Sequence, residues 1–391
     1  MAFNKLNIIH IHTDYKFVRG STIYYGEYFE NTIIIIQNNT PYEGPFKDTA
    51  LLLGHSSKDI NKIVKICINA DLVILYDLDK VKSKIVLKLP HDIRIAWRFF
   101  GYELYGKQLL SYISKNSRLV LGINKIPLHK HFINILRKGF NLIKYGRQDD
   151  GLFYNAIKRI TYFLALSPEE YDDLANHWDD LPEFLKLPLA VIPNNPNALN
   201  LNIEKERKKP VVIIGNSKSV YNNHLDIIRL IDQESNKYNF NFTILFNYGQ
   251  ENNYSDAVRK ATSQKNYYTI VEEFIPFEDF NFLYKKATAL VINGYRQMAL
   301  FNIFLGLQNG VKIYLNNRNI ILQWLAKEGF YVFTVEDFVK DLQNNNLTLS
   351  NNMAHHNLNQ SLNYSKKYTA LDYQKVLHSK LIENNFTIKK K

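Results

Sequence analysis

The clearest candidate for ligand chemistry is the end of an apolar run, Val211–Ile214, which leads through a polar loop into a helical pattern from Asn223. Glycine at the end of such a run lets the backbone approach a ligand closely. The free N–H groups and the dipole of a helix start favour an anion. We therefore predict a phosphate site, although an Asn or Ser cap on an ordinary strand-to-helix turn uses the same residue types. The candidate residues are Gly215, Asn216, Ser217, Asn223 and His224.

Two further strand ends in the same half carry suitable side chains. Tyr248 and Tyr254 follow one apolar run, where a tyrosine ring can lie against a base or a sugar; with 26 tyrosines in the chain, a core or surface role explains them equally well. Arg296 and Gln297 follow another run, and Asn302 lies in the helix beyond it. A guanidinium at a strand end suits bidentate contact with a pyrophosphate, and a surface salt bridge is the alternative.

The N-terminal half offers a candidate general base. Glu103 follows an apolar run by a glycine-containing turn, and a carboxylate there can accept a proton from an attacking hydroxyl. A glutamate that stabilises a helix start is the competing interpretation. His10, His12 and Asp14, at the end of the first apolar run, are second candidates for the same role of general base. Although the two histidines share a face at strand spacing, no third ligand is evident, so we predict no metal site.

The elements that must position these residues are strands and helices in alternation. Apolar runs rich in Ile and Val alternate with segments of helical spacing, which predicts a parallel sheet covered on both faces. In the N-terminal half we expect strands at Leu6–His12, Thr32–Ile36, Leu72–Tyr76, Ile93–Trp97 and Leu119–Ile123, and helices at 60–70 and 104–115. The same alternation begins again at Val211 and continues to Phe333. The fold class is therefore α/β, with two Rossmann-like, doubly wound domains.

A change in composition marks the domain boundary. Several prolines and an Asn-rich stretch between residues 188 and 210 precede a charge cluster at 204–209, which is typical of a linker. We predict an N-terminal domain at 1–204, a C-terminal domain at 205–365, and a C-terminal helix and tail at 366–391. Two such domains suit a ligand held in a cleft between them.

Bulk composition limits the environment and the partners. The chain has 391 residues, a formal net charge of +12 and one cysteine, Cys67, which cannot form an intrachain disulfide. We find neither a signal peptide nor an apolar run long enough to span a membrane, and expect a cytoplasmic protein that is either soluble or peripheral at the inner face of the plasma membrane. A basic amphipathic pattern at 128–144 is consistent with contact with an anionic membrane, and equally with ordinary packing. The positive charge also suits phosphorylated substrates or nucleic acid.

Taken together, these segments resemble the bacterial TDP-4-acetamido-4,6-dideoxygalactose transferases of enterobacterial common antigen synthesis. Trp97–Tyr105 is similar to that family's Trp-Gly-x-Asp-Leu-Tyr segment, with Glu103 at the acidic position. Residues 214–217 with Asn223 and His224 resemble its Gly-Asn-Ser…Asn-His segment. Further similarities are found at Tyr248, Gly249, Tyr254, the Arg296–Gln297 turn and residues 310–316. The chain departs from the pattern at Met298–Phe301, where the family has a Gly-rich stretch.

The resemblance implies a glycosyltransferase-B fold, in which the C-terminal domain holds a TDP- or UDP-linked sugar donor. The N-terminal domain would present a polyprenyl-diphosphate-linked saccharide as acceptor, in the synthesis of a bacterial surface polysaccharide. Such enzymes need no bound metal, so we expect no cofactor. The spacing of Asp77 and Asp79 fits a metal motif, but these residues lie in the predicted acceptor domain.

Three other functions remain open on sequence grounds. A pyruvyl transferase or a sugar-nucleotide epimerase can use a similar pair of domains. A basic nucleic-acid-binding protein would explain the charge, but we recognise no nucleic-acid module and the basic residues are dispersed. We therefore expect no nucleic-acid partner.

Overall fold

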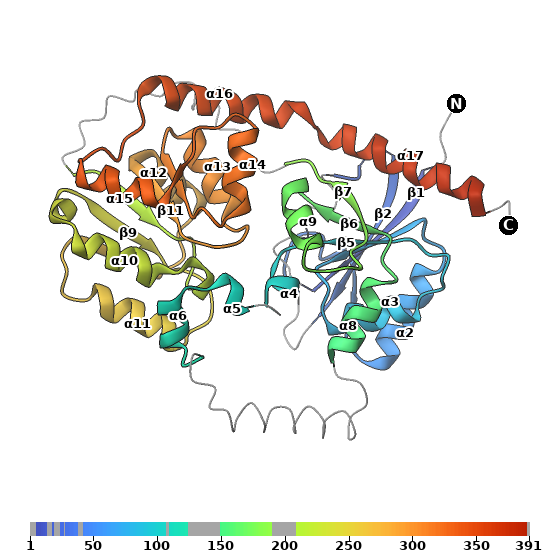
Figure 1. The fold of residues 1–391 in the computed structure, drawn as a ribbon. Coiled ribbons are helices and arrows are strands. Elements are labelled where there is room, and N and C mark those ends of the chain that lie inside the picture. The colour runs from blue at the N-terminus through green and yellow to red at the C-terminus, as the bar shows by residue number, and fades with distance from the viewer. Residues whose placement is uncertain are drawn as a thin grey trace. The chain divides into compact units, whose positions relative to one another are not determined.

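The computed structural model describes residues 5–13, 18, 24–26, 28–37, 42–106, 109–123, 149–189 and 209–388. The chain forms two compact units (Figure 1). Unit 1 comprises residues 1–104, 128–190 and 367–391, and unit 2 comprises residues 105–127 and 191–366. Each unit is built around its own parallel sheet.

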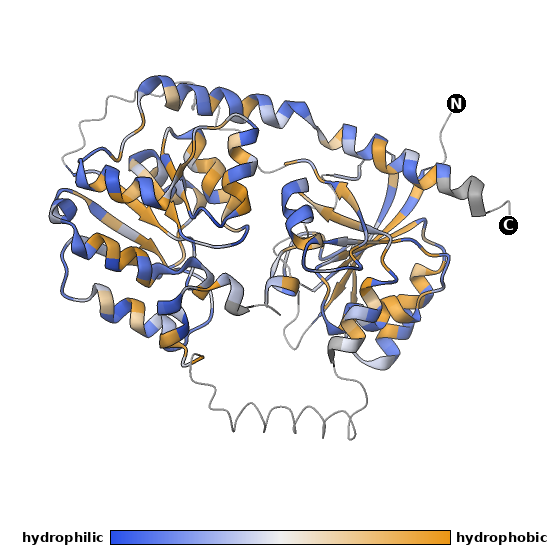
Figure 2. Ribbon diagram, in the orientation of Figure 1, coloured by the Kyte–Doolittle hydropathy of each residue, from blue (hydrophilic) through white to orange (hydrophobic). Residues whose placement is uncertain are grey.

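The sheet of unit 1 has seven parallel strands in the order β3-β2-β1-β4-β5-β6-β7. The strands are β1 (Leu6–His12), β2 (Phe29–Ile36), β3 (Leu51–Leu53), β4 (Leu72–Tyr76), β5 (Ile95–Arg98), β6 (Tyr162–Ala165) and β7 (Glu183–Lys186). Its helices are α2 (Ser57–Cys67), α3 (Lys80–Lys88), α4 (Tyr102–Tyr105), α8 (Asp149–Ile157), α9 (Pro168–Ala175) and α17 (Ala370–Ile388). All five residues of β4 are buried, as expected for a strand covered on both faces. This agrees with the apolar strands at the centre of each unit in Figure 2.

The sheet of unit 2 has six parallel strands in the order β10-β9-β8-β11-β12-β13. The strands are β8 (Val211–Ile214), β9 (Asn241–Leu245), β10 (Tyr268–Val271), β11 (Ala287–Ile292), β12 (Lys312–Leu315) and β13 (Phe333–Thr334). The main helices are α5 (Leu109–Tyr112), α6 (Lys115–Val120), α10 (His224–Gln233), α11 (Asn253–Thr262), α12 (Phe277–Lys286), α13 (Leu300–Gln308), α14 (Ile320–Lys327), α15 (Val335–Gln343) and α16 (Asn351–Lys367). In sequence order this is the 3-2-1-4-5-6 arrangement of a doubly wound Rossmann sheet. The predicted α/β class with two such sheets is therefore confirmed.

Two segments belong to a different unit from the residues next to them in the sequence: residues 105–127 belong to unit 2, and residues 367–391 belong to unit 1. Val120 and Leu121 pack against the core of unit 2, and the Ser114 N–H donates to Asn223 Oδ1 over 2.8 Å. Conversely, Tyr373 and Leu377 of α17 are fully buried in the core of unit 1. A single domain boundary near residue 205 therefore does not divide the chain into these two units. The two segments can be assigned only from the hydrophobic cores against which they pack.

Local predictions fail where the chain leaves the sheet of unit 1. The strand predicted at Leu119–Ile123 is wrong, because α6 covers residues 115–120 and a turn follows. The helix predicted at 104–115 is interrupted and divided among α4, α5 and α6. Ser114 starts α6 by accepting a hydrogen bond from the Ser117 N–H, so the apolar residues after it lie on a helix face rather than on a strand.

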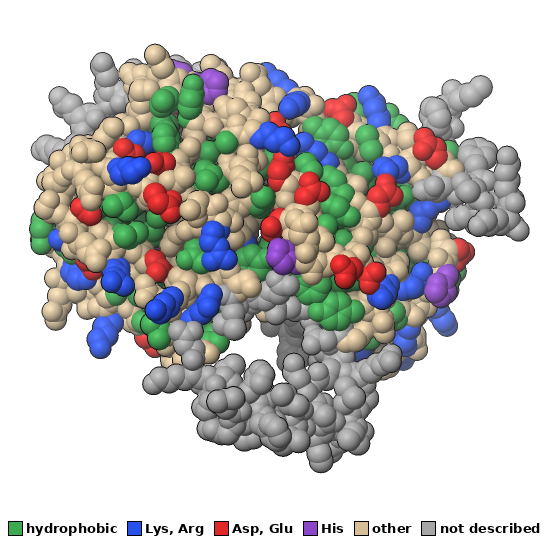
Figure 3. Space-filling model, in the orientation of Figure 1, with side chains coloured by type: hydrophobic (Ala, Val, Ile, Leu, Met, Phe, Trp, Pro, Cys, Tyr) green, Lys and Arg blue, Asp and Glu red, His purple; other side chains and the backbone are tan. Residues whose placement is uncertain are grey.

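Some predictions fall outside the described residues: the amphipathic pattern at 128–144, most of the linker and Asp14. Within the described part of the chain, no helix is both long and apolar enough to cross a membrane. Figure 3 shows lysine and arginine side chains interspersed with acidic ones over the visible face of each unit.

Candidate functional site

The phosphate-site prediction falls at the centre of the unit 2 sheet, where β8 and β11 are neighbours. In a doubly wound sheet the connections turn in opposite directions at this point, and ligands bind beyond the carboxyl ends of the strands. Residues 215–217 follow β8, and residues 293–296 follow β11. The Gly215 N–H donates to Val291 O over 2.9 Å, which fixes the start of the first loop against β11.

Gly215 is required by its surroundings as well as by its backbone. Its φ of +68° lies in the left-handed region, where a side chain is unfavourable. A Cβ atom would lie 2.3 Å from His224 Nε2 and 3.2 Å from Asn222 Oδ1. The polar atoms of both side chains therefore converge on the glycine, and any other residue would displace them.

His224, at the first position of α10, is fully buried. The Tyr254 hydroxyl accepts a hydrogen bond from the His224 N–H over 2.7 Å and lies 3.1 Å from the ring atom Nδ1. Because the hydroxyl proton is then free to point at Nδ1, this arrangement favours the tautomer with its proton on Nε2. Burial lowers the pKa of His224 to about 3, so the ring is neutral at physiological pH. Nε2, which faces Gly215, is buried without a partner.

Arg296 is held between two aromatic rings of unit 2. Its guanidinium carbon lies 4.4 Å from the ring centroid of Tyr221 and 5.2 Å from that of Tyr105. One Nη1–H donates to Gln297 O over 2.8 Å, and Nε is buried without a partner. The rings restrain the guanidinium and leave at least one N–H for a ligand.

Buried polar atoms without partners gather at these loops. A buried polar group that lacks its hydrogen bond costs about 1–3 kcal/mol, and a group left in that state calls for an explanation. Two are nitrogen atoms that can donate, and two are amide oxygens that accept: His224 Nε2, Arg296 Nε, Asn216 Oδ1 and Asn222 Oδ1. The donors suit phosphate oxygens and the acceptors suit hydroxyl groups. A phosphorylated, hydroxyl-bearing ligand would satisfy both kinds.

Other predicted ligand residues instead support the loops. Asn223 accepts from the Ser114 N–H and Ser117 Oγ, and its Nδ2 donates to Asn293 O over 3.0 Å. Its own backbone is left-handed, with a φ of +48°. These bonds use the whole amide, so Asn223 positions the strand-end loops of β8 and β11.

Four further predicted residues of unit 2 also have protein partners. The Tyr254 ring is fully buried beneath His224. Asn302 Nδ2 donates to the Tyr284 hydroxyl over 2.9 Å. Ser217 Oγ accepts from Asn222 Nδ2, and Tyr248, about half exposed, accepts from Asn216 Nδ2.

Sequence reasoning missed several residues of this site, namely Tyr105, Tyr221, Asn222, Asn293 and Asn316. One signal was available: asparagine follows the ends of β8, β9, β11 and β12 within two residues. Asn316 Nδ2 donates to Asn293 Oδ1 over 2.7 Å, so the amides link neighbouring strand ends. Tyr105 could not be identified, because it is far from Arg296 in sequence.

The carboxyl edge of the unit 1 sheet holds Glu103, which is buried in α4 after β5. Its Oε1 accepts from Trp97 Nε1 over 3.2 Å and from the Phe100 N–H over 3.3 Å, while Oε2 is buried without a partner. Burial, with a smaller contribution from the charge of Asp77, raises the pKa of Glu103 to about 7. A carboxyl group with this pKa and a free oxygen can exchange protons near neutral pH.

Asp77 and Asp79 follow β4 and face a buried lysine. Lys82 Nζ bonds Asp77 Oδ1, lies 3.2 Å from Asp79 Oδ2, and also donates to Thr13 Oγ1 over 2.5 Å. Asp79 in addition caps α3. The lysine occupies the space that a cation would need, and no group of three or more possible metal ligands occurs among the described residues.

His10 and His12 of β1 are both buried, but their surroundings differ. His10 Nε2 lies 2.9 Å from Asn31 Oδ1, and Nδ1 lies 3.3 Å from the Tyr76 hydroxyl. The His12 ring is stacked on Tyr76 at 3.8 Å, and neither of its nitrogens has a partner. Burial lowers the pKa of His10 to about 4 and that of His12 to about 2, so both rings are neutral.

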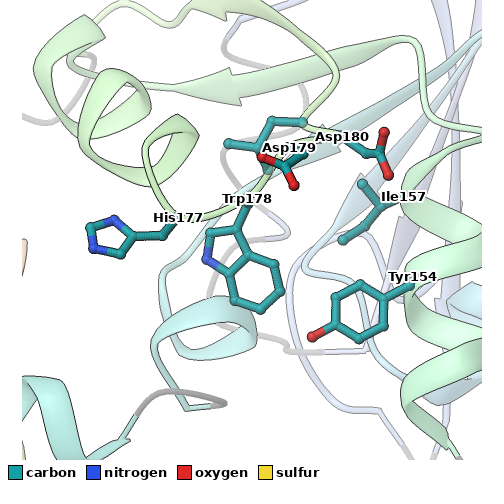
Figure 4. A pocket seen from close by; sticks show the side chains of 7 residues that line it. Tyr154, Ile157, His177, Trp178, Asp179 and Asp180 are labelled. Atoms are coloured by element: carbon teal, nitrogen blue, oxygen red, sulfur yellow. The ribbon is translucent and has the colours of Figure 1, made fainter.

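A separate pocket of about 200 Å³ opens in unit 1 (Figure 4). Trp178 stacks on Tyr154 within it, at 5.6 Å between centroids, and Asp179 and Asp180 lie beside them. The pocket is formed by the end of α8 and the loop before β7, which places it toward the amino ends of β6 and β7. It contains none of the predicted site residues.

Comparison with known proteins bears on the fold of the chain. No protein-family model matches the sequence, and no curated protein matches it. Solved structures that match nearly the whole length of the chain include the following three. HepE of Anabaena, crystallised with UDP and glucose, has a TM-score of 0.61 at 10% identity, covering 97% of this chain and all of that one. Sucrose-phosphate synthase of Thermosynechococcus elongatus has a TM-score of 0.63 at 9% identity, covering 98% and 100%.

The third is a glycosyltransferase of Rickettsia africae, with a TM-score of 0.57 at 12% identity over 97% of this chain and 99% of that one. At these identities the likeness concerns the fold, and it extends over nearly the whole chain. The chain therefore has the glycosyltransferase-B fold.

Proposed function

We propose that this protein is a glycosyltransferase that moves a sugar from a nucleoside diphosphate to an acceptor hydroxyl. The observation that carries the proposal is the convergence of His224 Nε2 and Asn222 Oδ1 on Gly215, next to the β8/β11 boundary where the strand order of the unit 2 sheet reverses. This position favours a phosphorylated ligand on physical grounds. The bound UDP in the structurally similar HepE agrees with it.

On the donor side, unit 2 would stabilise the leaving nucleoside diphosphate. As the bond to the anomeric carbon breaks, negative charge develops on the diphosphate. Arg296 and the neutral Nε2–H donor of His224 are already oriented, and the start of α10 adds a favourable dipole. This arrangement supplies the stabilisation through protein dipoles and one cation, so we expect no requirement for a divalent metal.

On the acceptor side, Glu103 would act as general base. Its unpartnered Oε2 takes the proton of the attacking acceptor hydroxyl, while the oxygen of that hydroxyl forms the new bond to the anomeric carbon. Only the ionised carboxylate can do this. Because its pKa is about 7, the active fraction rises as the pH rises through 7.

Within this class we propose a TDP- or UDP-linked donor carrying an acetamido-dideoxy sugar, and a lipid-linked saccharide acceptor. The support is the resemblance of Trp97–Tyr105 and of residues 214–224 to the transferases of enterobacterial common antigen synthesis. The pathway would be the synthesis of a bacterial surface polysaccharide.

The first test is a thermal-unfolding panel with TDP, UDP, GDP, CMP and phosphoenolpyruvate. A ligand that binds only the folded state raises the melting temperature by mass action. We expect a rise with one nucleoside diphosphate. In Arg296→Gln its affinity should fall about 10- to 100-fold, the loss expected for one charge-assisted hydrogen bond. No shift with any nucleotide would refute the donor site, and a shift with phosphoenolpyruvate alone would favour a pyruvyl transferase.

Turnover assays distinguish a transferase from a sugar-nucleotide epimerase. A transferase should release the nucleoside diphosphate from a donor sugar, faster when an acceptor is present. Conversion of a UDP-sugar into its epimer without acceptor, and with the nucleotide still attached, would identify an epimerase instead.

A further inference from the structure

Three side chains form a row across the carboxyl ends of adjacent strands in unit 1. In the sheet register Ile11 pairs with Leu75, so His12 of β1 lies beside Tyr76 of β4, and Tyr76 pairs directly with Arg98 of β5. Neighbouring strands are about 4.8 Å apart, which places the His12 and Arg98 backbones about 10 Å from each other. Tyr76, between them, stacks on His12.

Both ends of this row carry polar atoms without partners. Nδ1 and Nε2 of His12 and Nη1 of Arg98 are buried and make no hydrogen bond. Arg98 lies 5.7 Å from the Phe100 ring, and no carboxylate in the described part of the chain forms an ion pair with it. A buried guanidinium nitrogen left without a hydrogen bond costs more than a neutral group in the same state. The fold keeps Arg98 there at that cost.

The row is separate from the proposed base. Successive side chains of a strand point to opposite faces, so Trp97, which bonds Glu103, faces away from Arg98. Lys82 lies among Asp77, Asp79 and Thr13, which already use its ammonium group. Neither Glu103 nor the Lys82 cluster supplies a hydrogen-bond partner for the unpartnered nitrogens of His12 and Arg98.

We propose that His12 and Arg98 bind a phosphate group, and, resting on the proposed function, that this phosphate belongs to the acceptor. The Arg98 guanidinium supplies a charged, planar donor, and the His12 imidazole supplies a neutral N–H at the other end of the row. His12 is at the carboxyl end of β1, which forms the β1/β4 switch point where doubly wound sheets bind ligands, and Arg98 is at the carboxyl end of β5, the strand after β4 in the sheet.

The test measures phosphate binding to the full chain by thermal unfolding, with sodium phosphate replacing sodium chloride at constant ionic strength. UDP is present at saturation so that unit 2 is occupied. We expect phosphate to raise the melting temperature by about 2–4 °C. Arg98→Gln should remove this increment. The matched control Lys62→Gln, which removes one positive charge from the exposed side of α2, should keep it.

His12→Phe provides a second, independent variant. Phenylalanine preserves the stacking on Tyr76 and removes the two unpartnered nitrogens, so the ligand-free protein should melt at a higher temperature than the wild type. The phosphate increment should be smaller. A lower melting temperature together with an unchanged increment would count against the role of His12.

The outcomes separate this site from the donor site. If phosphate stabilises Arg98→Gln as much as the wild type, the inference is wrong even where UDP binds normally. If the increment is removed by Arg296→Gln instead, the anion lies in unit 2 and the inference is also wrong. If UDP fails to bind but the increment still depends on Arg98, the phosphate site stands and the proposed function does not.

Discussion

The two sheets share a topology but present different chemistry at the same place. In both, the first and fourth strands are neighbours, and candidate residues follow their carboxyl ends. In unit 2 this edge carries amides, one neutral histidine and one arginine held between rings. In unit 1 it carries the ion cluster of Lys82 with Asp77 and Asp79, and beyond it the buried Glu103.

The difference shows how one sheet topology can support two kinds of chemistry. Fixed neutral dipoles and one restrained cation can stabilise charge that develops on a ligand without themselves changing charge. A buried carboxyl group whose pKa has been raised to about 7 can instead gain and lose a proton. The topology determines where a ligand binds, and the side chains at the strand ends determine what the site can do.

The sharpest test of this contrast is Glu103→Gln. The amide keeps the shape of the side chain but cannot accept a proton. Turnover should fall about 10²- to 10⁴-fold, and the rise in activity through pH 7 should disappear, while UDP affinity stays within twofold. Steady-state kinetics across pH 5–9 with a parallel UDP titration would check this. Wild-type-like turnover would remove Glu103 from the mechanism.

The ion cluster of unit 1 can be broken with Lys82→Met. Removing the buried ammonium leaves Asp77 and Asp79 uncompensated, and such a loss costs about 3–5 kcal/mol of folding stability. With the lysine gone, the folded-state pKa of Asp77, already raised by burial, rises further. The deficit should therefore shrink as the pH falls through that pKa and Asp77 becomes neutral. Denaturant unfolding at pH 5 and pH 8 measures this, with Lys84→Met on the exposed side of α3 as control.

The smallest expected change in stability is that of Gly215→Ala in unit 2. A left-handed backbone costs alanine about 1–2 kcal/mol, and the new methyl group must displace His224. UDP binding should weaken by at least tenfold, because the displaced atoms belong to the proposed donor site. Gly106→Ala is the matched control, since nothing lies within 4 Å of its added Cβ. Equal UDP affinity in both variants would contradict the placement of the ligand.

Much of the fold could be predicted from local pattern. Leu6–His12, Leu72–Tyr76 and Val211–Ile214 are strands with the predicted bounds, because continuous β-branched runs are typical of buried parallel strands. The prediction of a strand at 119–123 is wrong, since a short apolar run is compatible with either element until a cap such as Ser114 decides it.

The candidate site, like the fold, could be predicted from the sequence only in part. Gly215, His224, Arg296 and Glu103 were proposed as site residues from residue type at the ends of apolar runs, because chain direction alone places such residues at the carboxyl edge of a parallel sheet. Only the tertiary structure shows which of their polar atoms have no hydrogen-bond partner. Tyr105 reaches Arg296 because residues 105–127 belong to unit 2, and the Lys82 cluster needs β1 beside β4. Local sequence pattern specifies most of the strands and the polar residues at their ends. The long-range pairing of strands, which no local pattern encodes, decides which of these ends meet.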